Sequence, residues 1–193
     1  MLKKIGLGLA AALLVLMAII VVNTIRYAPE DLTAPTADLA EVDAMPVAQK
    51  LGEAIRFKTV SHRRAISNDV PVFEGFLAWL AETYPGAHAA MELELLAELT
   101  PLYLWKGTDA AAKPILLTAH YDVVLVLSPE KWAQAPYGGE IADGFVWGRG
   151  ALDDKAALIA MLEAVERLAA TGFRPAQRSE EHPSELQSRS DVV

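Results

Sequence analysis

An uncharged run of 18 residues, Ile5 to Val22, stands near the start of the chain directly after Lys3 and Lys4. As a helix rising about 1.5 Å per residue it reaches about 27 Å, close to the hydrocarbon thickness of a bilayer. The lysine pair predicts a cytoplasmic N-terminus, with the rest of the chain outside the cytoplasm. A cleaved signal peptide is the alternative, but its apolar region is usually about 7 to 15 residues long, and no convincing cleavage site follows Val22. We therefore expect residues 1–26 to be an uncleaved, single-pass membrane anchor.

Composition limits what the remainder can be. The 193 residues leave room for one domain after the anchor. A net charge of −8 argues against a nucleic-acid partner, because no basic surface is available for phosphates. The chain has no cysteine, so any metal must be bound by His, Asp or Glu. Residues 27–45 are acidic and contain two prolines, which is typical of a tether between a membrane and a domain.

Apolar spacing predicts the elements of this domain. Helices are expected after Pro46, near Val72 to Thr83 and from about Asp153 to Ala170, where Gly172 and Pro175 follow. Short strands are expected near Glu92 to Glu98 and Leu102 to Trp105. Ile115 to Ala119, ILLTA, is apolar without alternation, which is typical of a strand buried on both faces. Alternating strands and helices favour a three-layer α/β domain.

His120 and Asp122 follow the predicted strand ILLTA, in the string AHYDVV. Side chains two residues apart on a strand share a face, so the carboxylate can lie beside the imidazole. This pairing fits a metal-binding histidine whose other ring nitrogen donates to an orienting acid. A surface His–Asp pair at a strand end is the alternative, and two residues alone favour it.

GRGALDDK, Gly148 to Lys155, is the second feature. Asp153 or Asp154 could cap the following helix, where an acid is favourable against the helix dipole. A role in metal binding is no more favoured than this cap on spacing alone. The glycines permit backbone geometry that other residues resist, so a close approach to a site is possible.

Taken together, these strings are far more specific. LLTAHYDVV, Trp132, YGGEIADGFVWGRGALDDK and GFRP resemble the zinc-dependent aminoacylase and carboxypeptidase family, which includes glutamate carboxypeptidase and succinyl-diaminopimelate desuccinylase. The likeness is strongest to its carboxypeptidase S branch, which also contains N-fatty-acyl-amino-acid hydrolases. It extends upstream through EAIRFKTVS, WLAETYP and LYLWKGTD, and so covers roughly Pro46 to Pro175. One departure is Leu125, where the family usually has proline.

The resemblance implies a zinc-exopeptidase-like catalytic domain with a mostly parallel central sheet. It makes His120 a zinc ligand, Asp122 its orienting acid and an active-site residue, and Asp153 the carboxylate that bridges two zinc ions. Asp154 would then cap and pack the helix. Cobalt or manganese could replace zinc, and the implied substrates are small peptides or N-acyl amino acids. In the family, a glutamate pair further along the chain supplies the general base and another ligand.

The tail RSEEHPSELQSR contains Glu180, Glu181 and His182. We expect residues 178–193 to be foreign sequence, because this string looks like a sequencing-library adapter translated in frame; a disordered acidic tail is the alternative. The few residues after Pro175 are expected to be too few to return the glutamates to the metal site. Residues 46–177 would then be the N-terminal part of a truncated catalytic domain. A non-catalytic, membrane-tethered interaction module is the alternative function.

Overall fold

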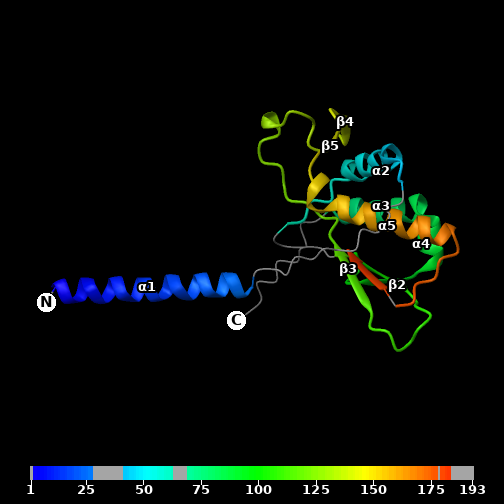
Figure 1. Ribbon diagram of the computed structural model, residues 1–193. Helices are drawn as coiled ribbons and strands as arrows, with labels where there is room; N and C mark the ends of the chain where they lie inside the picture. The colour runs from blue at the N-terminus through cyan, green and yellow to red at the C-terminus, as the bar shows by residue number, and fades with distance from the viewer. Residues whose placement is uncertain (1, 28–40, 63–68, 178, 184–193) are drawn as a thin grey trace. The chain divides into compact units, whose positions relative to one another are not determined.

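The computed structural model describes residues 2–27, 41–62, 69–177 and 179–183 (Figure 1). The chain forms two compact units, residues 1–42 and residues 43–193. Most of the predicted tether over 27–45 and most of the tail over 178–193 lie outside the described residues.

The first unit contains helix α1, Leu2–Arg26. Its stretch Lys4–Arg26 contains an 18-residue window with a mean hydropathy of 3.0 and is long and apolar enough to cross a membrane. A signal sequence near an N-terminus can meet the same criteria of length and composition. The helix predicted from the uncharged run is therefore confirmed, while its anchoring role stays a prediction.

Helix α2, Ala44–Arg56, opens the second unit. Asp43 caps it, since its carboxylate accepts a hydrogen bond from the Met45 amide at 3.1 Å. The helix thus begins two residues before Pro46, which lies in the first turn, where a missing N–H costs no helical hydrogen bond. Ala54 and Ile55 of the predicted apolar face are fully buried.

The other helices of the unit are α3, Val70–Thr83, α4, Pro85–Ala90, and α5, Ala156–Ala170. The apolar spacing near Val72 to Thr83 therefore predicted α3 correctly. α5 ends before Gly172, whose φ of +73° is readily adopted by glycine, as expected for that helix end. Together with two strands, these helices bury one apolar cluster that includes Phe73, Phe76, Leu80, Tyr84, Tyr121, Leu158, Ile159 and Leu162.

A four-stranded sheet of order β1-β2-β6-β3 lies against the helices. Its strands are β1, Glu92–Leu96, β2, Thr100–Trp105, β3, Ile115–Ala119, and β6, Ser179–Pro183. β1 pairs with β2 and β2 with β6 antiparallel, and only the β3–β6 pair is parallel. The expectation of a mostly parallel sheet is therefore wrong for the described strands. A tight turn with positive φ at Ala97 and Glu98 joins β1 to β2 and makes that pair antiparallel.

Strand β6 shows the course of the chain after Pro175. The amides of Thr108 and Asp109 donate to the carbonyls of Pro175 and Ala176, both at 3.0 Å, and guide the chain to the end of the sheet. β6 then enters between β2 and β3, with Ser179 opposite both Trp105 and Ile115. The short connection therefore reaches the sheet without crossing it, and that Glu180 and Glu181 stay outside the metal site remains a prediction. That residues 178–193 are foreign sequence stays a prediction.

Strand β3 was expected to be buried on both faces, and this is wrong. Ile115, Leu116 and Leu117 are 45%, 60% and 40% exposed, and only Ala119 at the end is buried. β3 is an edge strand of the described sheet, and helices α2 to α5 gather on one side of that sheet (Figure 1). The described residues therefore form two layers, helices on a sheet, and the apolar composition of β3 has no second layer to cover it.

Candidate metal centre

The segment that carries His120 and Asp122 follows β3 and is fixed by a second piece of chain. The Val123 amide donates to the Thr59 carbonyl at 2.8 Å, and the Ser61 amide donates to the Val123 carbonyl at 3.1 Å. The Thr59 hydroxyl, itself fully buried, donates to the Tyr121 carbonyl at 2.5 Å. These bonds hold the backbone directly after His120.

The three predicted site residues come together. His120 Nδ1 lies 3.1 Å from Asp122 Oδ1, and His120 Nε2 lies 2.9 Å from Asp153 Oδ1. The Asp122 side chain is buried, whereas that of Asp153 is 88% exposed. The hydrogen bond of Nδ1 goes to the Asp122 main-chain carbonyl, also at 3.1 Å, with the carboxylate beside it. A proton on Nδ1 alone leaves a lone pair on Nε2, which is the tautomer a metal ligand needs.

The charges around His120 favour a cation at this position. Burial lowers the pKa of the His120 imidazole, but hydrogen bonds and charge from Asp153 and Asp122 outweigh burial and raise the pKa above its usual value. The 2.9 Å contact between His120 Nε2 and Asp153 Oδ1 is a hydrogen bond when Nε2 carries a proton, as it does in the charged imidazole. A divalent metal ion could take the place of that proton.

Asp153 stands on a turn just before α5. The turn, Ala151–Lys155, has non-helical backbone angles at Asp153 and Asp154, whose peptide bond is cis. The helix predicted from Asp153 therefore starts only at Ala156, and Lys155 is its N-cap residue without a side-chain cap hydrogen bond. The expected helix cap by Asp154 is not formed, because the non-helical turn separates that carboxylate from the first helical residues.

Two glycines let this turn approach its neighbours closely, as the string GRG had suggested. Gly148 has a φ of +155°, and a Cβ there would lie 2.4 Å from the Ile55 side chain. Gly150 has a φ of +82°, and a Cβ there would lie 2.6 Å from Val123. The turn that carries Asp153 is thus packed directly against the segment that follows Asp122.

Lys155 is a residue of the site that the sequence analysis missed. It is fully buried, and its Nζ donates to the carbonyls of Ala54 and Phe57, both at 2.8 Å. These are carbonyls at the end of α2, which lack helical partners. Nζ also lies 5.0 Å from the centre of the Phe76 ring. Burial lowers the pKa of this lysine to about 7, although the Asp122 carboxylate acts in the opposite direction.

The signal for Lys155 was its place in GRGALDDK, directly before the apolar face of α5 and two residues after Asp153. A charged residue at the start of a helix is ordinarily solvated, so spacing did not single it out. In the structure, Lys155 links the turn that carries Asp153 to the end of α2 through these two hydrogen bonds.

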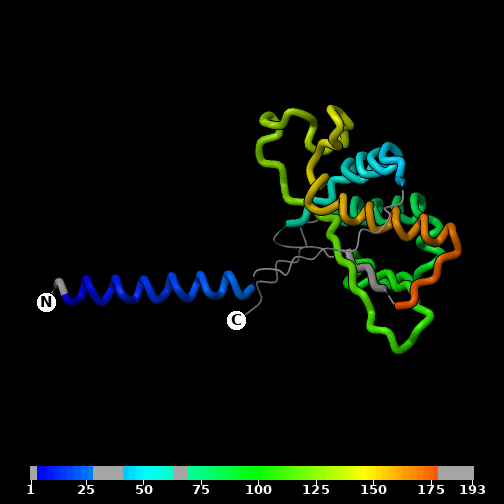
Figure 2. The backbone as a smooth tube through the Cα atoms, in the orientation of Figure 1, coloured from blue at the N-terminus to red at the C-terminus, as the bar shows by residue number. Residues whose placement is uncertain are grey.

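The sequence analysis also missed the hairpin formed by β4, Glu140–Ala142, and β5, Phe145–Trp147. Its signal was the Asp-Gly pair in EIADGFVW, because both turn residues, Asp143 and Gly144, have positive φ. Figure 2 traces the backbone from the end of β3 through a long loop and this hairpin back to the turn before α5. The loop and hairpin therefore belong to the surroundings of the site.

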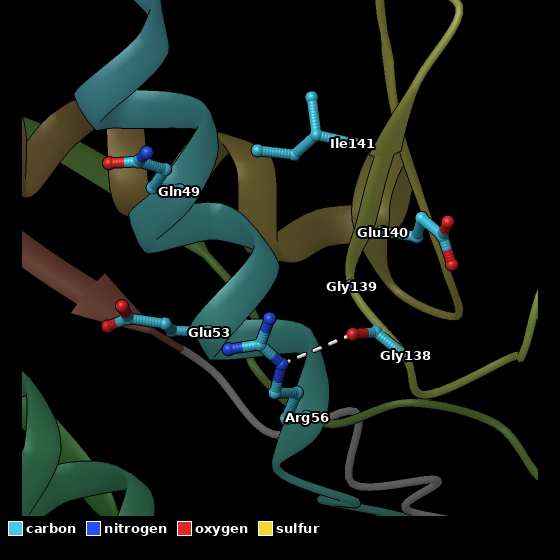
Figure 3. A pocket seen from close by; sticks show the side chains of 7 residues that line it. All are labelled: Gln49, Glu53, Arg56, Gly138, Gly139, Glu140 and Ile141. Atoms are coloured by element: carbon cyan, nitrogen blue, oxygen red, sulfur yellow. Dashed lines mark hydrogen bonds between the residues drawn. The ribbon is translucent and has the colours of Figure 1, made fainter.

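A hollow of about 500 Å³ lies between α2 and the chain leading into β4 (Figure 3). Arg56 donates from Nε to the Gly138 carbonyl at 3.2 Å across it, and Glu53 and Glu140 also line it. None of the predicted site residues lines this hollow. Its side chains carry charges of both signs and include no histidine.

In the part of the chain that the structure describes, the candidate site has fewer donor atoms than a metal ion normally needs. Within those residues no group of three or more His, Cys, Asp or Glu side chains is placed to hold a metal ion. His120 and Asp153 offer two donor atoms, and Asp122 orients one of them. A metal site normally takes three or four protein ligands, so further ligands would have to come from elsewhere.

Comparison with protein families and curated proteins gives consistent matches. Residues 116–181 match the model of peptidase family M20/M25/M40. Probable carboxypeptidase S-like 2 of Dictyostelium discoideum is 37% identical over 85% of this chain and 33% of its own length. Carboxypeptidase S of Saccharomyces cerevisiae is 38% identical over 66% of the chain and 24% of its own. N-fatty-acyl-amino acid synthase/hydrolase PM20D1 of Xenopus tropicalis is 34% identical over 90% and 36%.

Solved structures support the fold. Human carnosine dipeptidase 1 superimposes with a TM-score of 0.58 at 20% identity, covering 76% of this chain and 33% of that one. The metallo-carboxypeptidase Sso-CP2 of Sulfolobus solfataricus gives a TM-score of 0.57 at 21% identity, covering 72% and 30%. The chain thus spans about a third or less of most of these proteins, and it has the α/β fold of the corresponding part.

Proposed function

Because this chain belongs to peptidase family M20/M25/M40, we propose that it forms the N-terminal part of a metal-dependent hydrolase that cleaves amide bonds. The observation that carries this proposal is the single imidazole held between two carboxylates, Asp122 on Nδ1 and Asp153 on Nε2. An isolated surface His–Asp pair would need neither the second carboxylate nor the buried lysine behind it.

The proposed metal is zinc, in two ions, with cobalt or manganese as possible replacements. His120, through Nε2, and Asp153, through its carboxylate, are the residues of this chain that would hold the metal, with Asp153 as the ligand shared by both ions. Bound zinc lowers the pKa of a water and polarises a carbonyl, which is the chemistry that amide hydrolysis needs. Asp122 keeps the proton on His120 Nδ1, so that Nε2 stays a donor to the metal.

The proposed substrates are small peptides or N-acyl amino acids. The relatives named above as carboxypeptidase S and as an N-fatty-acyl-amino acid synthase/hydrolase support these two classes. The proposed location is a membrane, with α1 as a single-pass anchor, the N-terminus in the cytoplasm and the catalytic domain outside. The uncharged stretch of α1 and the lysine pair before it support this orientation.

The test uses the protein encoded by the complete gene, with bound metal and amide hydrolysis measured on the same samples. His120→Ala or Asp153→Ala should lower both together, because each removes a donor atom. Asp154→Ala is the matched control and should keep both, since its carboxylate is not proposed to bind metal. Full metal content and wild-type hydrolysis in His120→Ala would refute the proposed centre.

The 193-residue chain as written should bind zinc weakly and should not hydrolyse N-acyl amino acids, because its described residues offer two donors. Changing Glu180 and Glu181 together to Gln should alter neither property if the tail is foreign. Stoichiometric zinc and turnover that disappear with this double change would show that the tail supplies the missing ligands.

A non-catalytic, membrane-tethered interaction module is the second candidate, and the small number of donor atoms among the described residues is the observation that favours it. The genomic sequence after Gln177 distinguishes the two. A continuation into a strand that ends in a glutamate pair supports the hydrolase, whereas an authentic stop codon there supports the module.

A further inference from the structure

An apolar hollow of about 300 Å³ adjoins the turn that carries Asp153. Its lining residues are Trp132, Phe145, Val146, Trp147, Gly148, Ala151 and Leu152. We propose that this hollow binds the hydrocarbon chain of the acyl group of an N-acyl amino acid substrate. The proposal rests on the proposed hydrolase function and adds to it the place, and the residues, that select a long acyl chain.

The chemistry of the lining favours a hydrocarbon. No charged side chain lines this hollow. By contrast, Glu53, Arg56 and Glu140 line the hollow beside α2, and Lys106 and Arg174 line a third hollow near the end of β2. An alkyl chain has no polar group to offer such charges, so of the three hollows only this one suits it.

Both tryptophans of the lining are held by contacts with residues that do not line the hollow. Trp147 uses its indole N–H in a 3.0 Å hydrogen bond to the Ala142 carbonyl, across the hairpin. The guanidinium of Arg149 lies 5.0 Å from the centre of the Trp132 ring, and the Arg149 amide donates to the Pro136 carbonyl. A binding surface fixed before the ligand arrives loses less conformational freedom on binding.

The position of the hollow links it to the reaction. Leu152, one of its walls, directly precedes Asp153, Ala151 belongs to the same turn, and Gly148 lies three residues before Ala151. A substrate whose amide carbonyl lies at the metal held by Asp153 has its acyl carbons attached directly to that carbonyl. The acyl chain therefore begins beside the turn that carries Asp153. This turn offers the chain an apolar surface.

Two of the lining side chains still face water, so covering them with a ligand would favour binding. Leu152 is 89% exposed and Phe145 is 65% exposed. Covering such side chains with a hydrocarbon removes apolar area from water on both partners, which drives binding in proportion to the area. Since both side chains are exposed, replacing them should leave folding almost unchanged. A loss of binding in these variants can then be attributed to the hollow itself.

The test measures binding without hydrolysis. The full 193-residue chain is reconstituted in lipid nanodiscs, with a metal chelator present. N-butanoyl-, N-hexanoyl- and N-octanoylglycine are titrated by calorimetry, and empty nanodiscs serve as the blank. The affinity should rise about twofold to fourfold per methylene, the upper figure corresponding to about 0.8 kcal/mol for full burial. Leu152→Ser and Phe145→Ser should each weaken octanoylglycine about three- to tenfold and reduce the dependence on chain length.

Leu127→Ser is the matched control, because Leu127 is 85% exposed but does not line the hollow. It should bind all three ligands as the wild type does. The assignment is overturned if the wild type shows no dependence on chain length, if Leu152→Ser and Phe145→Ser keep it in full, or if Leu127→Ser weakens binding equally. That last result would indicate a general apolar surface, such as one that contacts lipid.

Failure of this proposal and failure of the proposed function give different results. If the complete protein does not hydrolyse any N-acyl amino acid but the dependence on chain length persists and needs Leu152, the hollow stands and the hydrolase does not. If short N-acyl amino acids are hydrolysed but Leu152→Ser leaves the chain-length dependence intact, the hydrolase stands and the hollow does not.

Discussion

Replacing Lys155 by Met should destabilise the domain measurably, although it exchanges a buried cation for an apolar side chain of similar length. Lys155 is fully buried and donates to the carbonyls of Ala54 and Phe57 at 2.8 Å. Methionine leaves the Ala54 carbonyl without this donor, at about 1 to 3 kcal/mol. The Phe57 carbonyl loses one of two donors, at about 1 kcal/mol, because the Thr59 amide still donates to it at 2.9 Å. Removing a cation that is costly to bury offsets part of this loss. We expect a net decrease of about 2 kcal/mol in the free energy of unfolding.

The assay is urea unfolding of the full chain in nanodiscs, followed by tryptophan fluorescence. With a slope of about 2 kcal/mol per molar urea, the midpoint should fall by about 1 M. Lys113→Met is the matched control, because Lys113 is exposed and surface changes usually stay within about 0.5 kcal/mol. A Lys155→Met midpoint equal to that of Lys113→Met would refute the idea that Lys155 fastens the Asp153 turn to α2.

Gly150→Ala should lower the free energy of unfolding by about 1 to 3 kcal/mol more than Gly144→Ala does in the same assay. Both glycines have positive φ, but only at Gly150 would a Cβ press into Val123. Equal losses would refute the packing argument. Burial raises the pKa of Glu163, but Lys50 and Arg167 outweigh it and hold the pKa below its usual value. The associated stability is present above the usual glutamate pKa of about 4.3 and is lost as the pH falls through the lowered one. Wild type should therefore lose its advantage over Glu163→Gln in acid melts, and a constant difference would contradict this. Asp122→Asn in the complete protein should keep some metal but reduce affinity or activity about 10- to 100-fold, because the imidazole loses its orienting acid; unchanged metal affinity and activity would exclude that role.

Local pattern was sufficient for several elements. An uncharged run with a basic flank can only be a long apolar helix, and α1 is one. Repeats of three and four residues placed the apolar faces of α2, α3 and α5, because helical geometry puts such residues on one side. His120 and Asp122 could be paired from their spacing, since two residues at a strand end share a face.

Other features depended on contacts between distant parts of the chain. The approach of Asp153 to His120 joins residues 33 positions apart and needed the family resemblance, because Asp153 and Asp154 are equivalent by spacing. The backbone of the turn decides between them, since its non-helical angles bring Asp153 to the imidazole and leave Asp154 without the capping role.

Sheet pairing and burial were decided by the tertiary structure alone. The apolar string ILLTA specifies a strand, but its exposure depends on which layers surround it, and here one side of β3 is uncovered. The place of β6 between β2 and β3 depends on hydrogen bonds from residues 108 and 109, about 70 positions away. The burial of Lys155 depends on the two carbonyls at the end of α2. Sequence spacing records which residues are neighbours along one element, whereas these three features depend on which elements meet.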